Sequence, residues 1–427
     1  MKGYYDIEEY EAYYRARDNG AYRVILHSDL NNFFASVECI LEPRLKNIPM
    51  AVCGDEELRH GIVLAKNELA KRYGVRTGDT ISDAKRKCDF IAIRKTRYDE
   101  YVKQSVRVRE IYLRYATRIE TFGIDEAWID VSALAARRGK DVFAAGKIIA
   151  DEIRNAVKSE TGLTVSIGVS FNKTFSKLAS DMKKPDAVTV ISYNDYQSII
   201  WKMPIRELLF VGRKTNEVLK KLKIQNVGDA ARQKRADMKN HLGKFGELLW
   251  DRANGYDLSP VSYYHNTDET KSISNSTTTP HDLTTEEEVT SVLIPLCEAV
   301  TEELRSRSKK ASTVKVYIKY SDFSSFIKQT KTLPTNSTKR VLDLALALFR
   351  ENVGEFFCIR SVGVSVEGFS DSASEQENIF DIKSPVDKTL DILRGKYGDD
   401  VIKRGCTVKN KAISSFDKKH VAFNSNI

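Results

Sequence analysis

The order of strand and helix patterns between residues 23 and 182 constrains the fold more than any other feature of this sequence. Apolar periodicity gives a strand, a helix, a tight hairpin, a second helix, a strand and a closing helix. These segments are, in order, 23–28, 31–42, the pair 119–122 and 127–131, 141–158, 164–169 and 173–182. Strand, helix, hairpin, helix, strand predicts a ferredoxin-like α/β sheet.

Three carboxylates lie at the ends of the predicted strands. Asp29 follows the first strand, and Asp125 with Glu126 forms the tip of the hairpin. On adjacent strands they would meet and repel one another unless cations lay between them. Two Mg²⁺ ions there would support phosphoryl transfer to a hydroxyl group. Acidic residues in a turn are also ordinary solvated turn formers, and the spacing alone favours that simpler interpretation.

The length of 427 residues predicts several domains, about three. The segment 39–95 looks inserted between parts of the larger sheet, and it includes an expected helix through LAKNELAKRYGV that stops at Gly74. Turn-forming residues near 254–260 indicate a boundary, after which helices at 285–307 and 337–353 alternate with strands. The polar stretch after Ser370 reads as a tail with one last helical pattern at 385–397.

Charge and cysteine usage narrow the function classes. The net charge is +9, and residues 206–244 hold 11 Lys and Arg against 4 Asp and Glu, which is +7 in one segment. Such local basicity is compatible with a polyanionic partner. The six cysteines form no CxxC pair, so neither a zinc ribbon nor a disulfide framework is indicated. We expect a cytoplasmic protein with no membrane association, because no leader or membrane-spanning run is evident.

Three motifs carry a resemblance to a known family. They are SDLNNFFASVE (28–38), FGIDEAWIDVS (122–132) and SIGVSFNKTFSKLASDMKKPD (166–186). Together they resemble the Y-family translesion DNA polymerases, nearest the bacterial DNA polymerase IV (DinB-like) branch. The resemblance continues through LFVGRKTNEVLKKLKIQNVGD (209–229), which is similar to the family's helix-hairpin-helix, and through KSISNSTTTP (271–280). It covers residues 22–370.

The resemblance implies an α+β right hand of several domains, with a ferredoxin-like palm, small fingers, a helical thumb and an α/β little finger. The expected domains are an N-terminal extension 1–20, palm 21–38 and 96–186, fingers 39–95, thumb 187–258, little finger 265–370 and a C-terminal tail 371–427. It also implies a template-directed polymerase that adds dNTPs to a primer 3′-hydroxyl across damaged DNA. Fingers this small enclose a base pair loosely, so we expect low fidelity.

The family's metal ligands match four positions. They are the carboxylates of Asp29, Asp125 and Glu126 and the backbone carbonyl of Leu30, which would hold two Mg²⁺ ions. No side chain is implied as an obligatory general base.

The resemblance implies nucleotide contacts at four further positions, one of which would discriminate deoxyribose from ribose. Phe34 matches the steric gate that excludes a 2′-hydroxyl, and Phe33 beside it is also read as a core aromatic. Lys184 matches a triphosphate contact, and Lys71 stands in place of an arginine that clasps the same phosphates.

DNA and a sliding clamp are the implied macromolecular partners. In the thumb, Gly212, Arg213 and Lys214 would meet a DNA phosphate ahead of an expected helix at 214–222. In the tail, Gln376, Ile379 and Phe380 resemble a clamp-binding peptide. No heptad repeat is present, and we expect a monomer.

The chain departs from the family pattern at four positions. Asn31 stands where many members have Asp, Gly123 where Ser is usual, and Glu68 where a triphosphate-contacting Tyr is common. Phe210 replaces the first glycine of the thumb hairpin.

Two other functions compete with polymerisation. A DNA-binding scaffold would keep the basic thumb but drop a carboxylate, and all three are present. A nucleotidyl cyclase would also put paired acids on a ferredoxin-like sheet, but it would not need the thumb or the little finger.

Overall fold

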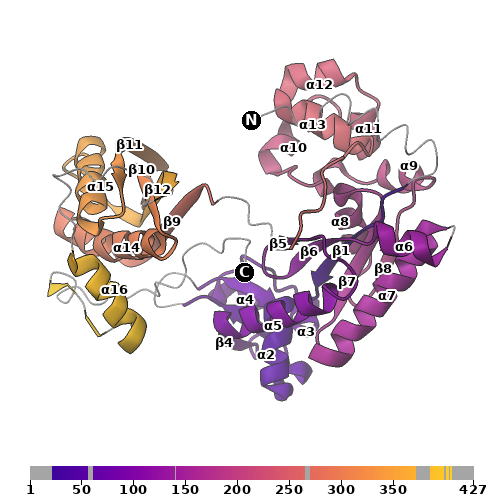
Figure 1. Cartoon of the computed structure of the whole chain (residues 1–427), viewed down its shortest axis with the longest axis horizontal. Helices are drawn as coiled ribbons and strands as arrows, with labels where there is room; N and C mark the ends of the chain where they lie inside the picture. Colours follow the sequence, from indigo (N-terminus) through magenta and orange to yellow (C-terminus); the bar gives the residue numbers. More distant parts are fainter. Residues whose placement is uncertain are drawn as a thin grey trace. The chain divides into compact units, whose positions relative to one another are not determined.

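The computed structural model describes residues 22–55, 61–139, 141–264, 270–371, 385–398, 401–402 and 404–405. The chain divides into two compact units, the first built chiefly from residues before 267 and the second chiefly from residues after it (Figure 1). Each unit has its own apolar core. No described helix is both long enough and apolar enough to cross a membrane.

A five-stranded sheet organises the described part of the first unit. Its strand order is β5-β6-β1-β7-β8, and every pair is antiparallel except β7 with β8. The strands are β1 Ile25–Leu30, β5 Ile119–Phe122, β6 Glu126–Asp130, β7 Val165–Ser170 and β8 Val188–Val190. The first four in this order reproduce the ferredoxin-like arrangement, which confirms the fold class predicted from the segment order.

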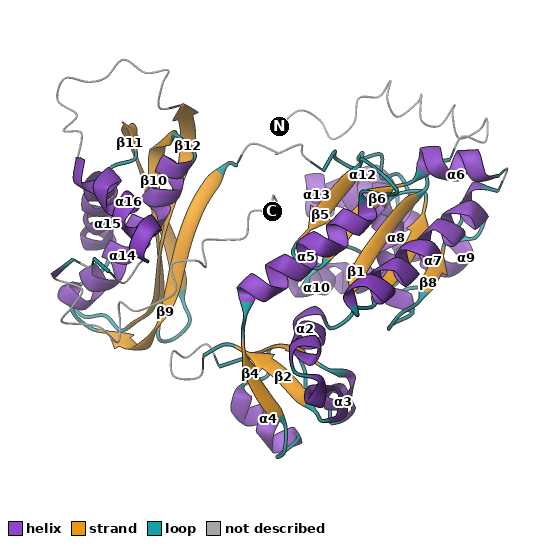
Figure 2. Cartoon of the chain, turned by 60° about the horizontal axis from the view of Figure 1, so that its bottom comes forward, coloured by secondary structure: helices purple, strands orange, loops and turns teal. Residues whose placement is uncertain are grey.

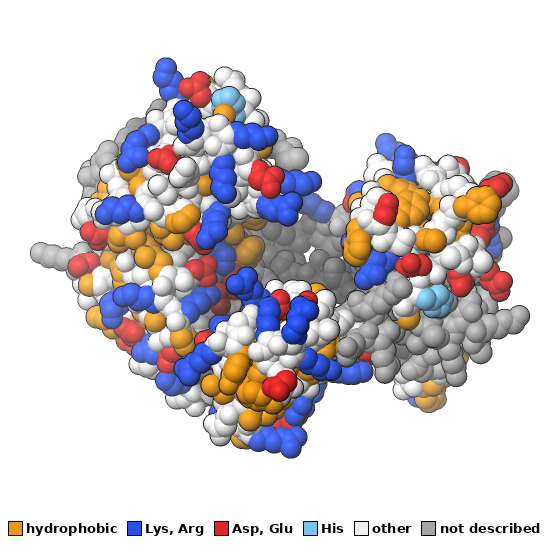
Figure 3. Space-filling view, turned by 180° about the vertical axis from the view of Figure 1, so that it is seen from behind, with side chains coloured by type: hydrophobic (Ala, Val, Ile, Leu, Met, Phe, Trp, Pro, Cys, Tyr) orange, Lys and Arg blue, Asp and Glu red, His pale blue; other side chains and the backbone are white. Residues whose placement is uncertain are grey.

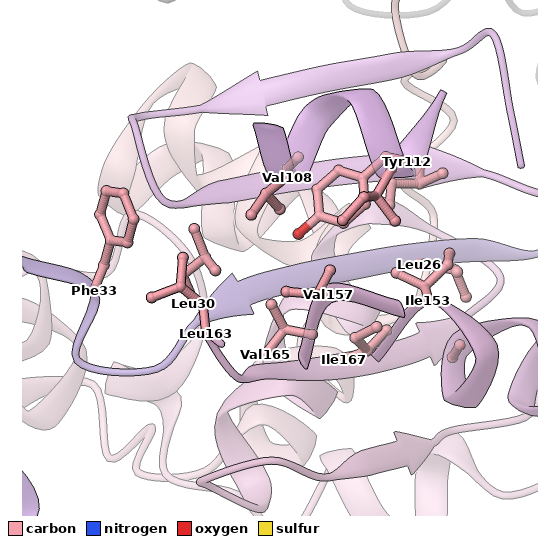
Figure 4. Close-up of a cluster of buried hydrophobic side chains, with 14 of the residues drawn as sticks. Leu26, Leu30, Phe33, Val108, Tyr112, Ile153, Val157, Leu163, Val165 and Ile167 are labelled. Atoms are coloured by element: carbon pink, nitrogen blue, oxygen red, sulfur yellow. The ribbon is translucent and has the colours of Figure 1, made fainter. Parts of the chain in front are cut away.

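Helices cover both faces of this sheet. One face carries α5 and α7, whose side chains join Leu26, Leu30 and Ile167 in the core shown in Figure 4; Figure 2 shows both helices crossing the sheet. The other face carries α8, which lies directly on β7 because Gly168 has no side chain to keep it away. The helices are α5 Tyr98–Tyr112, α6 Ser132–Arg138, α7 Val142–Thr161 and α8 Lys173–Met182.

The inserted segment forms a small three-stranded sheet with short helices. Its strands have the order β3-β2-β4. The elements are α2 Phe33–Leu41, η1 Pro43–Asn47, β2 Met50–Cys53, β3 Val63–Lys66, α3 Glu68–Arg72, α4 Ile81–Lys87 and β4 Ala92–Lys95. The helix expected through LAKNELAKRYGV is confirmed only for Glu68–Arg72, just before Gly74. Its first three residues belong to β3, and α3 starts only after Asn67, whose side chain accepts the Ala70 N–H.

The basic segment folds into short helices around aromatic residues of the sheet-bearing part. Phe171 and Phe175 pack with Ile200, Leu219 and other apolar residues of these helices. The elements are α9 Tyr196–Ile200, η2 Ile205–Glu207, α10 Arg213–Lys221, α11 Val227–Ala231, α12 Arg235–Leu242 and α13 Lys244–Ala253.

The described part of the second unit is a four-stranded antiparallel sheet with two long helices on it. The strand order is β11-β10-β12-β9, and α14 and α15 fill the core with apolar side chains. The elements are β9 Ser272–Leu283, α14 Glu286–Ser306, β10 Lys309–Tyr320, β11 Ser325–Thr335, α15 Thr338–Asn352 and β12 Ile359–Asp371.

One more helix belongs to the second unit, and it has the bounds of the helical pattern that the sequence placed in a C-terminal tail. The helix α16, Pro385–Tyr397, is tied to α14 by Arg305 with Asp391 and by Arg394 with Glu298. Arg394 and Glu298 are both buried, at 4% and 5% exposure. The described part of this unit therefore includes a helix beyond residue 370, where the sequence predicted the unit to end.

Candidate active site

The three acidic residues meet at one edge of the five-stranded sheet. The register of β1 and β6 puts Asp29 directly opposite Glu126, so both side chains leave the same face. The Leu30 N–H donates to the Asp125 carbonyl at 3.0 Å, which fixes the hairpin tip beside the end of β1. Asp29 is the fifth residue of β1, inside the strand rather than after it.

Two lysines from the helix side neutralise these carboxylates. Lys184 Nζ lies 2.7 Å from Asp29 Oδ2, and Lys177 Nζ lies 2.5 Å from Glu126 Oε2. Lys177 is on α8 and Lys184 follows that helix. The contact of α8 with Gly168 therefore delivers both cations to the acidic edge.

The environment separates the pKa values of the three acids. The pKa of Asp29 is raised to about 6, because burial and the charges of Glu126 and Asp125 together outweigh the opposing effect of Lys184. Burial, followed by the charge of Glu126, also raises the pKa of Asp125. Burial acts the same way on Glu126, but hydrogen bonds from His27 and Lys177 outweigh it and hold its pKa at about 2.

The donor chemistry of this edge fits a divalent cation. Carboxylate oxygens are the ligands that hard cations prefer, and the crowded acids gain from a compensating positive charge. Among the described residues, however, no three acidic, His or Cys side chains already converge on one metal position. Lys184 contacts one oxygen of Asp29, and Lys177 contacts one oxygen of Glu126.

The two phenylalanines of α2 lie in different surroundings. Phe33 is buried in the core, at 3% exposure, which leaves it little surface to offer a nucleotide (Figure 4). Phe34 is half-buried and stacks flat on Tyr101, with ring centroids 4.3 Å apart and planes 13° apart. Tyr98 closes one side of it edge-on at 5.7 Å. Phe34 therefore has one supported face and a partly open one.

Lys71 and Asn31 both make contacts that sequence reasoning did not foresee. Lys71, on α3, pairs through its Nζ with Glu68 Oε1 at 2.8 Å rather than with the three acids of the sheet edge. Asn31 donates to Ser166 Oγ at 3.0 Å and accepts the Asp186 N–H at 2.9 Å. It thus holds the segment that carries Lys184 against the end of β1.

Two residues of the site escaped sequence reasoning. His27 was assigned no role, and its ring is fully buried, with Nε2 3.3 Å from Glu126 Oε2 and Nδ1 2.8 Å from Ser180 Oγ. Lys177 carried no signal of its own, because a lysine on a helix is usually solvated. The two-residue alternation of β1, which puts His27 and Asp29 on one face, was the available clue for the histidine.

The proposed DNA-contact residues lie at an exposed helix start. Gly212 is the N-cap of α10, and the Arg213 side chain is 92% exposed while pairing only loosely with Glu217 at 3.2 Å. Lys214 is also exposed. Figure 3 shows Lys and Arg side chains spread over the part that α10 to α13 form. Phe210 has a positive φ of 71° and supports the Arg252 guanidinium on its ring.

Gln376, Ile379 and Phe380 lie outside the described residues, so the clamp-binding interpretation of that peptide stays a prediction.

Comparison with known proteins identifies the family. Residues 28–181 match the impB/mucB/samB family, and residues 270–379 match the impB/mucB/samB family C-terminal domain. The chain is 42% identical to the DNA polymerase IV of Acetivibrio thermocellus, over 92% of this chain and 99% of that protein. It is 34% identical to the DNA polymerase IV of Clostridium acetobutylicum, over 91% of this chain and 99% of that protein.

A solved structure gives the same result for the fold. The Y-family DNA polymerase chimera Dbh-Dpo4(243-245)-Dbh superposes with a TM-score of 0.71 and 24% sequence identity, covering 82% of this chain and 99% of that one. The match extends beyond the sheet that a nucleotidyl cyclase would share, and the relatives span the basic helices and the second unit as well. The chain therefore belongs to the impB/mucB/samB family, as a Y-family translesion DNA polymerase of the DNA polymerase IV branch.

Proposed function

We propose that the chain extends a DNA primer with dNTPs, selected by a template strand, at a centre formed by Asp29, Asp125 and Glu126. The observation that carries this proposal is the register of β1 and β6, which pairs Asp29 with Glu126 beside the Asp125 carbonyl. The reaction transfers a nucleotidyl group to the primer 3′-hydroxyl and releases pyrophosphate. The small inserted fingers suit synthesis across damaged templates, because they enclose a base pair loosely.

Dependence on a divalent metal is general in this family, and we assign two Mg²⁺ ions to this chain. The carboxylates of Asp29, Asp125 and Glu126 and the carbonyl of Leu30 would hold them. Bound there, the ions lower the pKa of the 3′-hydroxyl and neutralise charge on the triphosphate and pyrophosphate. The close approach of three buried carboxyl groups supports this assignment: burial, and after it the charges of the neighbouring acids, raises the pKa values of Asp29 and Asp125, and a bound cation would offset both effects.

We assign Lys184 to a contact with the triphosphate. Its ammonium group lies at the Asp29 edge and also pairs with Asp181 at 2.8 Å. A metal ion bound by Asp29 would compete with this ion pair, and Lys184 would then be available to neutralise a phosphate. Asn31 holds the neighbouring Asp186 in place, so the lysine stays at this edge.

Phe34 would select deoxyribose over ribose. Its ring rests on Tyr101 and is held at its edge by Tyr98, so it cannot retreat from a sugar packed on its open face. A 2′-hydroxyl would then collide with the ring or lose its water without a new hydrogen bond.

The proposed macromolecular contacts lie in the basic helices and in the C-terminal segment. The exposed cationic start of α10, with Gly212, Arg213 and Lys214, would grip a DNA phosphate without reading sequence. The peptide containing Gln376, Ile379 and Phe380 would dock in an apolar pocket of a sliding clamp and raise the local enzyme concentration at a primer end. We also propose that the protein acts as a monomer in the cytoplasm.

Single-nucleotide extension of an annealed primer in Mg²⁺ tests the proposal. Glu126→Gln should lower kcat at least about a hundredfold, because it removes charge that acts in the transition state. Glu152→Gln, on an exposed ion pair of α7, is the matched control and should extend normally. Phe34→Ala should raise the use of ribonucleotides relative to dNTPs about a hundredfold. Wild-type protein that binds primer-template but extends nothing would overturn the proposal.

A further inference from the structure

Glu68 occupies a position between two groups that are suited to bind a phosphate. Its Oε1 accepts a hydrogen bond from Asn32 Nδ2 at 2.8 Å and an ionic one from Lys71 Nζ at 2.8 Å. Asn32 directly precedes α2, three residues after Asp29, whereas Lys71 belongs to α3 of the inserted segment. A single carboxylate oxygen therefore joins the inserted segment to the turn beside the catalytic edge.

Local backbone structure on both sides of the Glu68–Asn32 hydrogen bond fixes the position of Glu68. On one side Asn67 fixes the start of α3, because it accepts from Ala70 N and Met50 N and donates to the carbonyls of Leu45 and Ile48. On the other side Asn32 has a left-handed φ of 50°, which turns its side chain out of the α2 helix start without a capping bond. Glu68 and Asn32 thus belong to two turns whose backbone conformations are fixed locally.

The surroundings of Glu68 are cationic. Lys66 lies on the preceding strand. Its pKa is lowered, chiefly by partial burial and next by the nearby charge of Lys71. The ammonium groups of Lys66 and Lys71 repel each other, and the Asn32 amide donor is close to Lys71. A polyanion would neutralise both charges and accept more hydrogen bonds than one carboxylate can. Lys184 brings another ammonium group to the Asp29 end of β1.

We propose that Glu68 is a resident counter-ion that occupies the phosphate-binding donors Lys71 and Asn32 in the free enzyme and must be displaced by the triphosphate of an incoming nucleotide. Glu68 therefore weakens nucleotide binding, and its removal strengthens it. The inference rests on the proposed polymerase function, since that function supplies the triphosphate.

Nucleotide affinity measured without chemistry tests this inference separately from catalysis. The full chain is bound to a primer-template whose primer ends in a dideoxynucleotide, and the Kd of the next correct dNTP is measured in Mg²⁺ by a quench of template fluorescence. Glu68→Gln and Glu68→Ala should lower this Kd about threefold to tenfold, because one screened like charge is removed near the triphosphate. Lys71→Ala should raise it.

Glu100→Gln is the matched control. Glu100 forms the same kind of exposed i,i+3 pair, with Lys103 at 2.7 Å, and its removal changes the net charge equally. Its Kd should equal that of the wild type. A Kd that stays the same or rises in Glu68→Gln, in a protein that extends primers normally, would overturn the inference while leaving the polymerase function intact. Lack of extension by the wild type would count against the function instead.

Discussion

Asp257 accepts two hydrogen bonds from Thr174, one from its backbone N–H at 3.1 Å and one from its hydroxyl at 2.8 Å. Ser259 donates to the other oxygen of the same carboxylate. The Arg23 guanidinium donates to the carbonyls of Asp257 and Ser259. The chain that leaves the basic helices is thus fastened to the start of α8, the helix that carries Lys177.

Asp257→Ala should lower the free energy of unfolding by about 3 kcal/mol, because it leaves buried donors without an acceptor. Urea denaturation measures the change. Asp343→Ala, on an exposed pair with Lys339, should change stability by less than about 0.5 kcal/mol. Equal stability of the two variants would contradict this account of Asp257.

The contribution of Asp257 should also depend on pH. Burial raises its pKa, but hydrogen bonds from Ser259 and Thr174 outweigh burial and hold the pKa below the ordinary value. Its stabilisation is therefore complete above about pH 4, the pKa of an unfolded Asp, and is lost as the pH falls through the lower pKa of the folded state. The difference in unfolding free energy between wild type and Asp257→Asn should shrink below about pH 4. A difference that grows on acidification would show that the shift has the opposite sign.

Gly168→Ala should disturb the site from a distance. A Cβ atom at this position would fall well inside contact distance of the Ser176 carbonyl and 2.8 Å from Ala179 Cβ, so α8 would have to move off the sheet. We expect a loss of about 2 kcal/mol in stability together with lower primer extension, since Lys177 and Lys184 move with the helix. Gly354→Ala has open space around it and should be neutral in both measurements.

Lys184→Ala should raise the KM for dNTPs about tenfold, because one charge-assisted contact to the triphosphate is lost. Steady-state extension measures KM and kcat separately. Lys147→Ala, which breaks an exposed pair with Asp151, serves as the control. An unchanged KM in Lys184→Ala would restrict this lysine to holding Asp29 in the metal-free protein.

Arg394→Ala should destabilise the second unit by about 3 kcal/mol, because it removes a partner from the buried Glu298 carboxylate. Differential urea denaturation and protease sensitivity of α16 measure this. Lys339→Ala, on the exposed side of α15, gives the baseline. If α16 were merely a tail resting on the surface, the two variants would unfold alike.

The sequence predicted regular elements well where local signals agreed. The helix 173–182 has the predicted bounds, and the hairpin at 119–131 forms as expected, because periodicity and turn residues point the same way there. The acidic edge was also predicted from Asp29 and the hairpin tip. Prediction was wrong in LAKNELAKRYGV, where strong helix formers at 64–66 are recruited into β3 by pairing with β2, an interaction that local propensity does not contain.

The partners of the site could not be predicted, because they depend on contacts between distant segments. Lys177 reaches Glu126 only because α8 packs on Gly168, and Glu68 reaches Asn32 across 36 positions. The helix pattern at 385–397 was visible, but its polar buried face, with Arg394 and Asp387 inside, reads in sequence as a solvated helix.

The stack of Phe34 on Tyr101 also links the two ends of the inserted segment. Phe34 lies on α2, the helix that enters the inserted segment, and Tyr101 lies on α5, the helix that leaves it. Glu38 of α2 also forms an ion pair with Arg97, the residue directly before α5. The two ends of the insertion are thus clasped together outside the insertion itself. We therefore expect substitutions inside residues 39–95 to leave the support of Phe34 by Tyr101 unchanged, and with it the proposed choice between ribose and deoxyribose.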